Sequence, residues 1–228
     1  MDANERASRA NGRGGAPTAR RCTRLGPVIR AVLFDVDGVV RRWDPALITD
    51  AERAHGLPVG SLSASAFADP WLTLAVTGAL GDADWRAGVT TRLAGAANCA
   101  LPQAAAAVAQ WSASPGATDP DVLELLRRQR AVRTVALLSN ATDRLELDLG
   151  DLGLLQEVDA VFNSSRLGVA KPDPAVFAAV AADLGLPPEQ CAFVDDTLTH
   201  VRAGTSAGLR AHHFTDIQAL ATFLAILR

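Results

Sequence analysis

Two aspartates, Asp35 and Asp37, lie two residues apart directly after a mostly apolar run at residues 28–34. The run is rich in β-branched and aliphatic residues and is broken at Gly38, which predicts a buried strand that delivers both acids to a loop. Open parallel sheets bind their ligands at the carboxyl edge of the strands. Two carboxylates held this close repel each other, so the spacing indicates a cation, a proton or an electrophile nearby. An acidic turn without chemistry fits the same segment.

Ser139 and Asn140 follow a second apolar run, at residues 135–138. Their hydroxyl and amide groups can donate hydrogen bonds to an anion. We expect the next helix to begin at once, so that its free N–H groups and the positive end of its dipole lie beside them. The pair therefore predicts an anion site, and the alternative is an ordinary helix cap.

Asp195 and Asp196 follow a third apolar run, at residues 191–194. A helix cap explains one of the two acids and leaves the other unexplained. Magnesium prefers oxygen ligands, typically one or two carboxylates together with waters and substrate phosphate. If this strand lies beside the first, its acids meet Asp35 and Asp37 around one cation.

Lys171 is the only lysine of the chain, and the other 21 basic residues are all arginine. An ammonium group on a slim, flexible stem differs physically from a planar guanidinium fork. The exception therefore indicates a site where arginine would not fit, just before a helix predicted to begin at Asp173-Pro174. Chance in an arginine-rich composition is the alternative.

Alternating strands and helices are expected to position these groups. The alternation is typical of an α/β fold with a Rossmann-like, doubly wound, mostly parallel five-stranded sheet and right-handed crossovers. The strands are predicted at residues 28–34, 132–138, 158–162, 191–194 and 211–214.

Residues 44–117 show a helical, alanine-rich pattern without a strand-like run, and they separate the first strand from the others. Three helices are predicted there, capped or begun at Asp44, Asp82 and Leu101. We therefore expect a small all-helical cap inserted into an α/β core. The expected organisation is an extension at 1–27, a core at 28–43 and 118–228, and the cap at 44–117.

The composition limits the class of protein. With 228 residues, 49% of them hydrophobic, the chain suits one α/β domain of ordinary size with a modest insertion. The sequence contains no run of about 18 apolar residues, so no membrane span is predicted. Three widely spaced cysteines argue against a disulfide framework and favour a reducing cytoplasm. Residues 1–27 are rich in arginine without hydrophobic periodicity, so we expect a disordered extension and no nucleic-acid partner.

The order and spacing of these four segments resemble the haloacid dehalogenase-like (HAD) hydrolase superfamily, in the branch with a small helical cap after the first strand. Sugar-phosphate phosphatases and the phosphatase domains of epoxide hydrolases belong to that branch. The resemblance implies that Asp35 attacks phosphorus and Asp37 acts as general acid and then base. It also implies that Lys171 offsets negative charge while Ser139 and Asn140 bind phosphoryl oxygens.

The same resemblance implies a Mg²⁺ site. Its ligands would be the Asp35 side chain, the Asp37 main-chain carbonyl and Asp196, with Asp195 holding a metal-bound water. A phosphate monoester carries about two negative charges near neutral pH. Bringing it to several carboxylates requires a divalent cation and Lys171.

The expected function is Mg²⁺-dependent hydrolysis of a small phosphorylated metabolite through an aspartyl-phosphate intermediate, by a monomer or homodimer with no membrane partner. Two alternatives stay open. One is a 2-haloacid dehalogenase, which the resemblance disfavours because such enzymes lack the second acid of the pair. The other is a catalytically silent regulator that binds phosphorylated ligands. Phosphomutase activity is a narrower variant of the expected phosphatase function.

Several other residues are ambiguous. Trp71, Trp85 and Trp111 fall in the cap, where core packing is the default and a place in the substrate pocket for one or two of them is the alternative. Arg41, Arg42 and Trp43 follow residues 35–38, the nucleophile loop that the resemblance implies, and substrate contact and an exposed turn explain them equally. The histidines, His200 among them, show neither pairing nor metal-ligand spacing.

Overall fold

The computed structural model describes residues 28–227, and the expected extension at 1–27 lies outside the described residues. A five-stranded sheet has the order β5-β4-β1-β6-β7, with every neighbouring pair parallel. The predicted α/β, doubly wound sheet is therefore confirmed. Its strands are β1 (Ala31–Phe34), β4 (Thr134–Ser139), β5 (Ala160–Asn163), β6 (Cys191–Asp195) and β7 (Arg210–His213).

The register of the sheet brings the predicted site residues to one edge. β1 lies between β4 and β6, and Phe34 is level with both Leu137 and Val194. Asp35 is therefore level with the ends of both neighbours, because parallel strands finish at the same edge. Separate apolar runs far apart in the sequence thus deliver their polar ends to one place.

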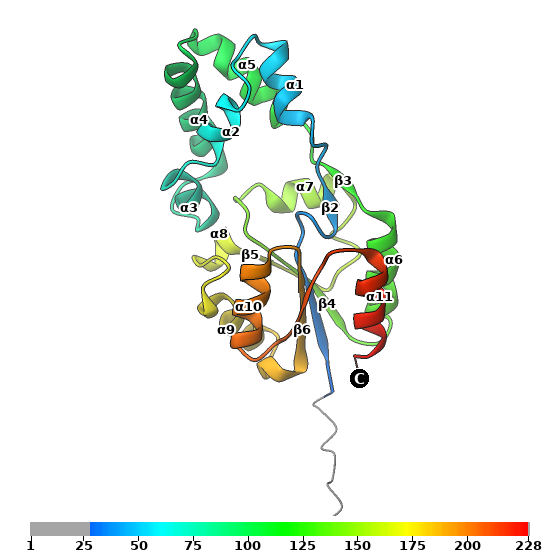
Figure 1. Cartoon of the computed structure of the whole chain (residues 1–228). Helices are drawn as coiled ribbons and strands as arrows, with labels where there is room; N and C mark the ends of the chain where they lie inside the picture. The colour runs from blue at the N-terminus through cyan, green and yellow to red at the C-terminus, as the bar shows by residue number, and fades with distance from the viewer. Residues whose placement is uncertain (1–27, 228) are drawn as a thin grey trace, which may run out of the picture.

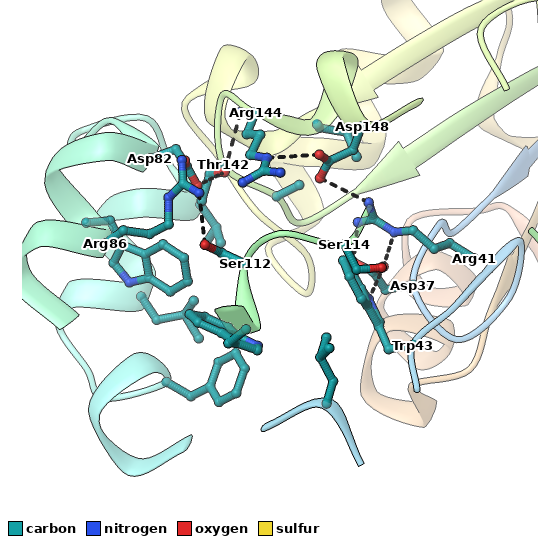
Figure 2. Close-up of a pocket in the computed structure, with 18 of the residues that line it drawn as sticks. Asp37, Arg41, Trp43, Asp82, Arg86, Ser112, Ser114, Thr142, Arg144 and Asp148 are labelled. Carbon is teal, nitrogen blue, oxygen red and sulfur yellow. Dashed lines mark hydrogen bonds and ion pairs between the residues drawn. The ribbon is translucent and has the colours of Figure 1, made fainter. Parts of the chain in front are cut away.

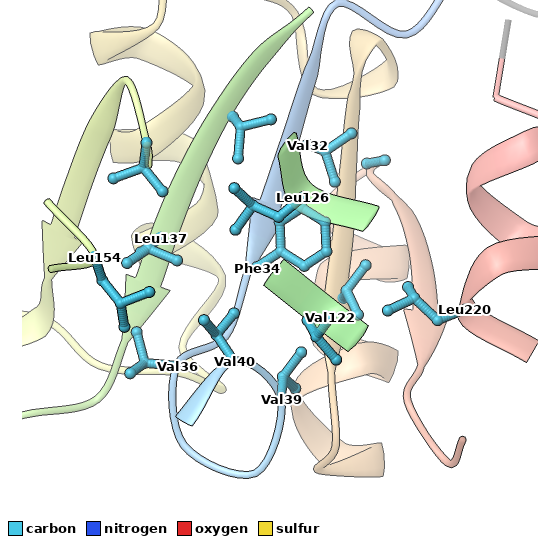
Figure 3. Packing of buried hydrophobic residues seen from close by; sticks show 14 of the residues in the cluster. Val32, Phe34, Val36, Val39, Val40, Val122, Leu126, Leu137, Leu154 and Leu220 are labelled. Atoms are coloured by element: carbon cyan, nitrogen blue, oxygen red, sulfur yellow. The ribbon is translucent and has the colours of Figure 1, made fainter. Parts of the chain in front are cut away.

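Helices cover both faces of the sheet (Figure 1). Alternate residues of each strand point to opposite faces, so the apolar runs supply two cores. Figure 3 shows one of them, in which Val32 and Phe34 pack with residues of α6 and α11. Leu33 and Phe193 pack on the other face with α9. Helix α10 (Leu198–Ser206) packs on the same face as α9 (Pro174–Asp183), whereas α6 (Pro120–Arg130) and α11 (Ile217–Ala225) cover the first face.

Five helices form a cap at the end of the molecule toward which β1 runs (Figure 1). They enclose a hydrophobic cluster of their own that includes Leu62, Trp85 and Leu93. The helices are α1 (Leu47–Ala54), α2 (Ser61–Ala66), α3 (Trp71–Val76), α4 (Asp82–Ala97) and α5 (Leu101–Trp111).

Two details of the cap differ from the sequence prediction. Helices α2 and α3 were not predicted, because six residues are too few to show a helical period and neither helix has a side-chain cap. Asp82 does not cap α4, whose N-cap is Gly81. Its carboxylate instead accepts a hydrogen bond from Thr142 of the core at 3.0 Å, so it joins cap to core.

A two-stranded antiparallel ribbon joins the cap to the core, and it was not predicted from the sequence. β2 (Arg41–Arg42) pairs with β3 (Ala117–Thr118) where the chain enters and leaves the cap. Strands of two residues are too short for an alternation signal. The ribbon places Arg41 beside the nucleophile loop.

The short segments after β4 and β5 also matter for the site. Helix α7 (Leu145–Asp151) begins five residues after Asn140, so the prediction of a helix N-terminus directly beside Ser139 and Asn140 is wrong. The intervening turn reaches toward the cap instead. The remaining elements are α8 (Ser164–Leu167) and the 3₁₀ helix η1 (Pro188–Gln190). Within residues 28–227, none of the helices has the length and apolar character to cross a bilayer.

Candidate active site

Asp35 lies at the end of β1 with only 6% of its surface exposed. Its Oδ1 accepts the backbone N–H of Val36 at 2.7 Å and forms an ion pair with Lys171 Nζ at 2.9 Å. Across residues 28–227, Oδ2 makes no comparable contact. One oxygen of the carboxylate is therefore anchored and the other is free to attack an electrophile.

Lys171 is 3% exposed and occupies the centre of the site. Besides Asp35, its ammonium contacts Asp195 Oδ2 at 2.7 Å and donates to the Leu138 carbonyl at 3.0 Å. Three acceptors match the three N–H donors of an ammonium group. A planar guanidinium could not place its donors in this way, which gives a physical reason for the single lysine.

Asn140 holds Lys171 in place through the backbone. Its Nδ2 donates to the Lys171 carbonyl at 2.7 Å, and its Oδ1 accepts the Lys171 N–H at 2.8 Å. Sequence reasoning gave Asn140 the task of binding phosphoryl oxygens, but its side-chain amide is committed to this bidentate contact. Ser139 beside it is buried, and its hydroxyl has no hydrogen-bond partner among the residues described, so its role as a hydroxyl donor to an anion stays a prediction.

Asp195 is completely buried and helps to hold the Lys171 ammonium in place. Its carboxylate accepts the N–H of Thr197 at 2.7 Å and contacts His200 Nδ1 at 3.2 Å, in addition to Lys171. With these partners the carboxylate is already satisfied, so its predicted role beside a metal-bound water stays a prediction. The contacts make Asp195 a second anchor for Lys171.

His200 is a site residue that sequence reasoning missed. It lies in the first turn of α10, five residues after Asp195, and one ligand atom from each of Asp35, Asp195 and His200 lies within 4.8 Å of the others. The signal would have been its position one turn into the helix that follows an acidic strand end. Isolated spacing rules for histidine pairs cannot detect it.

The two buried acids around Lys171 differ in proton affinity. Burial raises the pKa of Asp35 to about 7, although the charge of Lys171 acts against this. Burial would also raise the pKa of Asp195, but hydrogen bonds from His200, the charge of Lys171 and the Thr197 N–H outweigh it and hold it below its usual value. One ammonium thus balances one carboxylate, and Asp35 is the acid that still requires a cation or proton.

Asp37 lies in the same loop but has a different environment, with 40% of its side chain exposed. Arg41 donates to both carboxylate oxygens, at 2.7 and 3.1 Å, and the Trp43 indole N–H donates at 2.8 Å. Arg41 is itself buried and also reaches Asp148 at 3.3 Å. Of the three residues that sequence reasoning left between substrate contact and an exposed turn, Arg41 and Trp43 therefore hold Asp37, and Arg42 pairs with Asp119 instead.

The donor set fits a hard divalent cation. Asp196 is exposed and lies against the nucleophile loop, where a Cβ on Gly38 would stand 2.0 Å from Asp196 Oδ2. Gly38 has φ +80°, a conformation that favours glycine, so the loop leaves room for that carboxylate. Asp35 and Asp196 would hold Mg²⁺ together with the Asp37 carbonyl, because such all-oxygen sites suit this ion.

Two cavities meet at this site. A catalytic cavity of about 310 Å³ is lined by the predicted residues with the exception of Asp195, and by His200 and Thr197. A second cavity of about 410 Å³ lies between cap and core (Figure 2). Asp37 and Asn140 line both, so a ligand can extend from one into the other.

The fold and the site define a hydrolase of one family. The family model for haloacid dehalogenase-like hydrolases matches residues 29–208, and the chain belongs to this family. A HAD family enzyme from Bacteroides thetaiotaomicron, solved with magnesium and inorganic phosphate, superposes with a TM-score of 0.66 at 20% identity. The match covers 82% of this chain and 94% of that one. An L-2-haloacid dehalogenase from Xanthobacter autotrophicus gives 0.60 at 21%, covering 88% and 84%.

Curated relatives match over shorter stretches. Phosphatase MT3486 of Mycobacterium tuberculosis is 34% identical over 86 residues, or 37% of this chain and 40% of the relative. A phosphoserine phosphatase of Thermus thermophilus is 34% identical over 89 residues, 38% and 36% respectively. The matches span about two fifths of the length of these relatives, so they support a shared family and do not by themselves assign an activity to this chain.

Proposed function

We propose that this hydrolase is a Mg²⁺-dependent phosphatase that acts on a small phosphorylated metabolite through an aspartyl-phosphate intermediate. The observation that carries the proposal is the pair of acids on one loop with different environments. Asp35 is buried against Lys171 with one free oxygen, and Asp37 is half-exposed beside the entrance to the second cavity. A nucleophile and a proton carrier are the two groups that hydrolysis of a phosphomonoester needs.

In the first half-reaction, Asp35 Oδ2 attacks phosphorus while Oδ1 stays bound to Lys171 and the Val36 N–H. The new bond joins Oδ2 to phosphorus, and the bond from phosphorus to the ester oxygen breaks. Asp37, protonated from solvent, donates its proton to the departing oxygen. Lys171 and the Ser139 hydroxyl stabilise the charge that develops on the phosphoryl oxygens.

In the second half-reaction, water hydrolyses the aspartyl phosphate. Asp37, now a carboxylate, accepts the proton of the attacking water, and phosphate leaves while Asp35 is regenerated. Arg41 and Trp43 hold the carboxylate of Asp37 in one orientation between the steps. A dehalogenase has no alkoxide to protonate and so no use for this second acid.

Mg²⁺ bound by Asp35 and Asp196 would supply positive charge for the phosphate dianion. The high pKa of Asp35 supports this part of the proposal, because a cation at the site favours the ionised nucleophile. The magnesium and phosphate in the Bacteroides thetaiotaomicron neighbour fit the same reading.

The proposal is tested by phosphate release from a panel of phosphomonoesters with and without Mg²⁺, in wild type and Asp35→Asn. We expect Mg²⁺-dependent release that Asp35→Asn abolishes. Equal release by both proteins would contradict the mechanism. Because dehalogenases are among the structural neighbours, 2-chloropropionate belongs in the panel, and metal-independent chloride release without phosphate release would favour that alternative.

A further inference from the structure

We infer that the alcohol part of the substrate is uncharged and apolar, so that the substrate class is the phosphate monoesters of hydrophobic alcohols. The inference rests on the proposed function and deepens it. It comes from the composition and the charge balance of the second cavity, which the alcohol part must enter when the phosphate lies at Asp35.

The position of the cavity assigns it to the leaving group. Its wall includes Asp37, the proposed donor to the departing oxygen, and Asn140, which fixes Lys171. A phosphate bound between Asp35 and Ser139 therefore directs its ester oxygen toward Asp37 and its alcohol beyond it. The volume of about 410 Å³ lies in the range of small-molecule sites.

One wall of the cavity is aromatic. Phe67 contacts Trp111 edge-on with ring centroids 6.1 Å apart, and Trp111 contacts Trp85 at 5.8 Å. The three rings come from the end of α2 and from α4 and α5, so the cap assembles them from separate helices. Aliphatic side chains complete the apolar lining, namely Leu47, Ile48, Leu72, Val76 and Leu145.

With the exception of Asp44, the charged side chains of the cavity are paired with one another (Figure 2). All three arginines in the lining bind carboxylates that also belong to it. Their positive charges are therefore balanced within the lining, and a charged group of a ligand would compete with these carboxylates. The pairs join Arg41 to Asp37 and Asp148, Arg144 to Asp148, and Arg86 to Asp82.

Two of the hydroxyl groups are engaged as well. Ser112 Oγ accepts a hydrogen bond from Arg86 at 3.2 Å, and Thr142 Oγ1 donates to Asp82 at 3.0 Å. The remaining lining acid, Asp44, accepts the N–H of Ala46 at 2.8 Å. A sugar or an amino acid would lose water at this surface and find few free partners, which costs binding energy. An apolar group loses nothing and gains the aromatic wall.

The test compares two esters of primary alcohols that differ in polarity but have similar ring size, cyclohexylmethyl phosphate and glucose 6-phosphate. Binding is measured by calorimetry to Asp35→Asn in Mg²⁺, so that it does not depend on turnover, and O-phosphoserine is included as a charged ester. We expect cyclohexylmethyl phosphate to bind roughly tenfold or more tightly than either polar ester, because apolar surface leaves water.

Matched variants locate the effect. Phe67 lines the cavity and is 49% exposed, whereas Leu101 lies on the cap outside it and is 55% exposed. Phe67→Ala should reduce the preference for the apolar ester about fivefold, as expected for loss of one aromatic contact. Leu101→Ala should leave the preference unchanged.

Equal or tighter binding of glucose 6-phosphate or O-phosphoserine to Asp35→Asn would overturn the inference, as would a preference unaffected by Phe67→Ala. The proposed function is judged separately. Wild type that hydrolyses all three esters with similar kcat/KM, in an Mg²⁺-dependent way, would refute the substrate class and leave the phosphatase standing. Absence of phosphate release together with a clear preference for binding the apolar ester would refute the phosphatase activity and leave the apolar selectivity of the second cavity standing.

Discussion

Removal of the Lys171 ammonium should destabilise the fold, and the loss should grow with pH. Lys171→Met leaves the stem volume nearly unchanged but deletes ion pairs to Asp35 at 2.9 Å and Asp195 at 2.7 Å. Both carboxylates stay buried, at 6% and 0% exposure. Breaking a buried pair by removing one partner typically costs about 3–5 kcal/mol, because the other charge loses its compensation.

The pKa of Asp35 sets the pH window. It is raised from 3.8 to about 7 in the folded protein, and removal of Lys171 takes away a cation that lowers it. Above pH 7 both acids are ionised in the wild type, so the variant bears the full cost of about 3–5 kcal/mol. Near pH 5 Asp35 is protonated in both proteins. The cost then falls to about 1.5–3 kcal/mol, the value of one hydrogen bond to the charged Asp195.

The measurements are urea unfolding and thermal unfolding at pH 5 and pH 8 in EDTA, so that no divalent cation replaces the ammonium. At pH 8 the melting temperature should fall by about 10 °C for a domain of this size. Arg128→Met removes an exposed cation paired with Glu124 and should change stability by less than about 1 kcal/mol. Lys171→Met/Asp195→Asn should recover part of the loss. A loss that is equal at both pH values, or larger at pH 5, would refute the reasoning.

Three further predictions concern the nucleophile loop and its partners. Gly38→Ala should weaken Mg²⁺ binding in calorimetry at least about tenfold, because its Cβ would occupy the position of the Asp196 carboxylate and its φ is +80°. Arg41→Met should lower kcat for an alkyl ester about tenfold and change the pH–rate profile, since Asp37 loses its bidentate partner. Metal-free wild type should lose up to about 4 kcal/mol of unfolding free energy between pH 4 and pH 8. The reason is that the raised pKa of Asp35 favours the folded state only while that acid is protonated. Asp35→Asn should flatten this pH dependence.

Much of the fold could be predicted because it depends on local patterns. The apolar runs at residues 28–34, 135–138 and 191–194 are each followed by polar residues, and the alternation of such runs with helices predicts a parallel sheet. The pairing of β2 with β3 could not be predicted, because a strand of two residues carries no period. Helices α2 and α3 are equally short and depend on the cluster around Leu62 rather than on their own sequence.

The members of the site could be predicted better than their tasks. Asp35 and Lys171 lie together as the motifs indicated. Asn140 was assigned to the ligand, yet its amide binds the backbone of Lys171, a contact between residues 31 positions apart that no local pattern reveals. His200 was not assigned to the site because its contact with Asp195 depends on where α10 begins after β6, and sequence reasoning considered only spacing between histidines.

The two cavities differ in charge balance, and this difference explains how one small site can select both ends of a substrate. In the catalytic cavity Lys171 compensates Asp195 while Asp35 and Asp196 still require positive charge, so the phosphate end binds only together with a cation. In the second cavity every arginine of the lining is paired, so the alcohol end binds best when it brings no charge. Arg41 belongs to both systems, because it binds Asp37 on one side and Asp148 on the other. A charged alcohol that drew Arg41 away would therefore also release the proton carrier, and selection against such substrates would act on kcat as well as on KM.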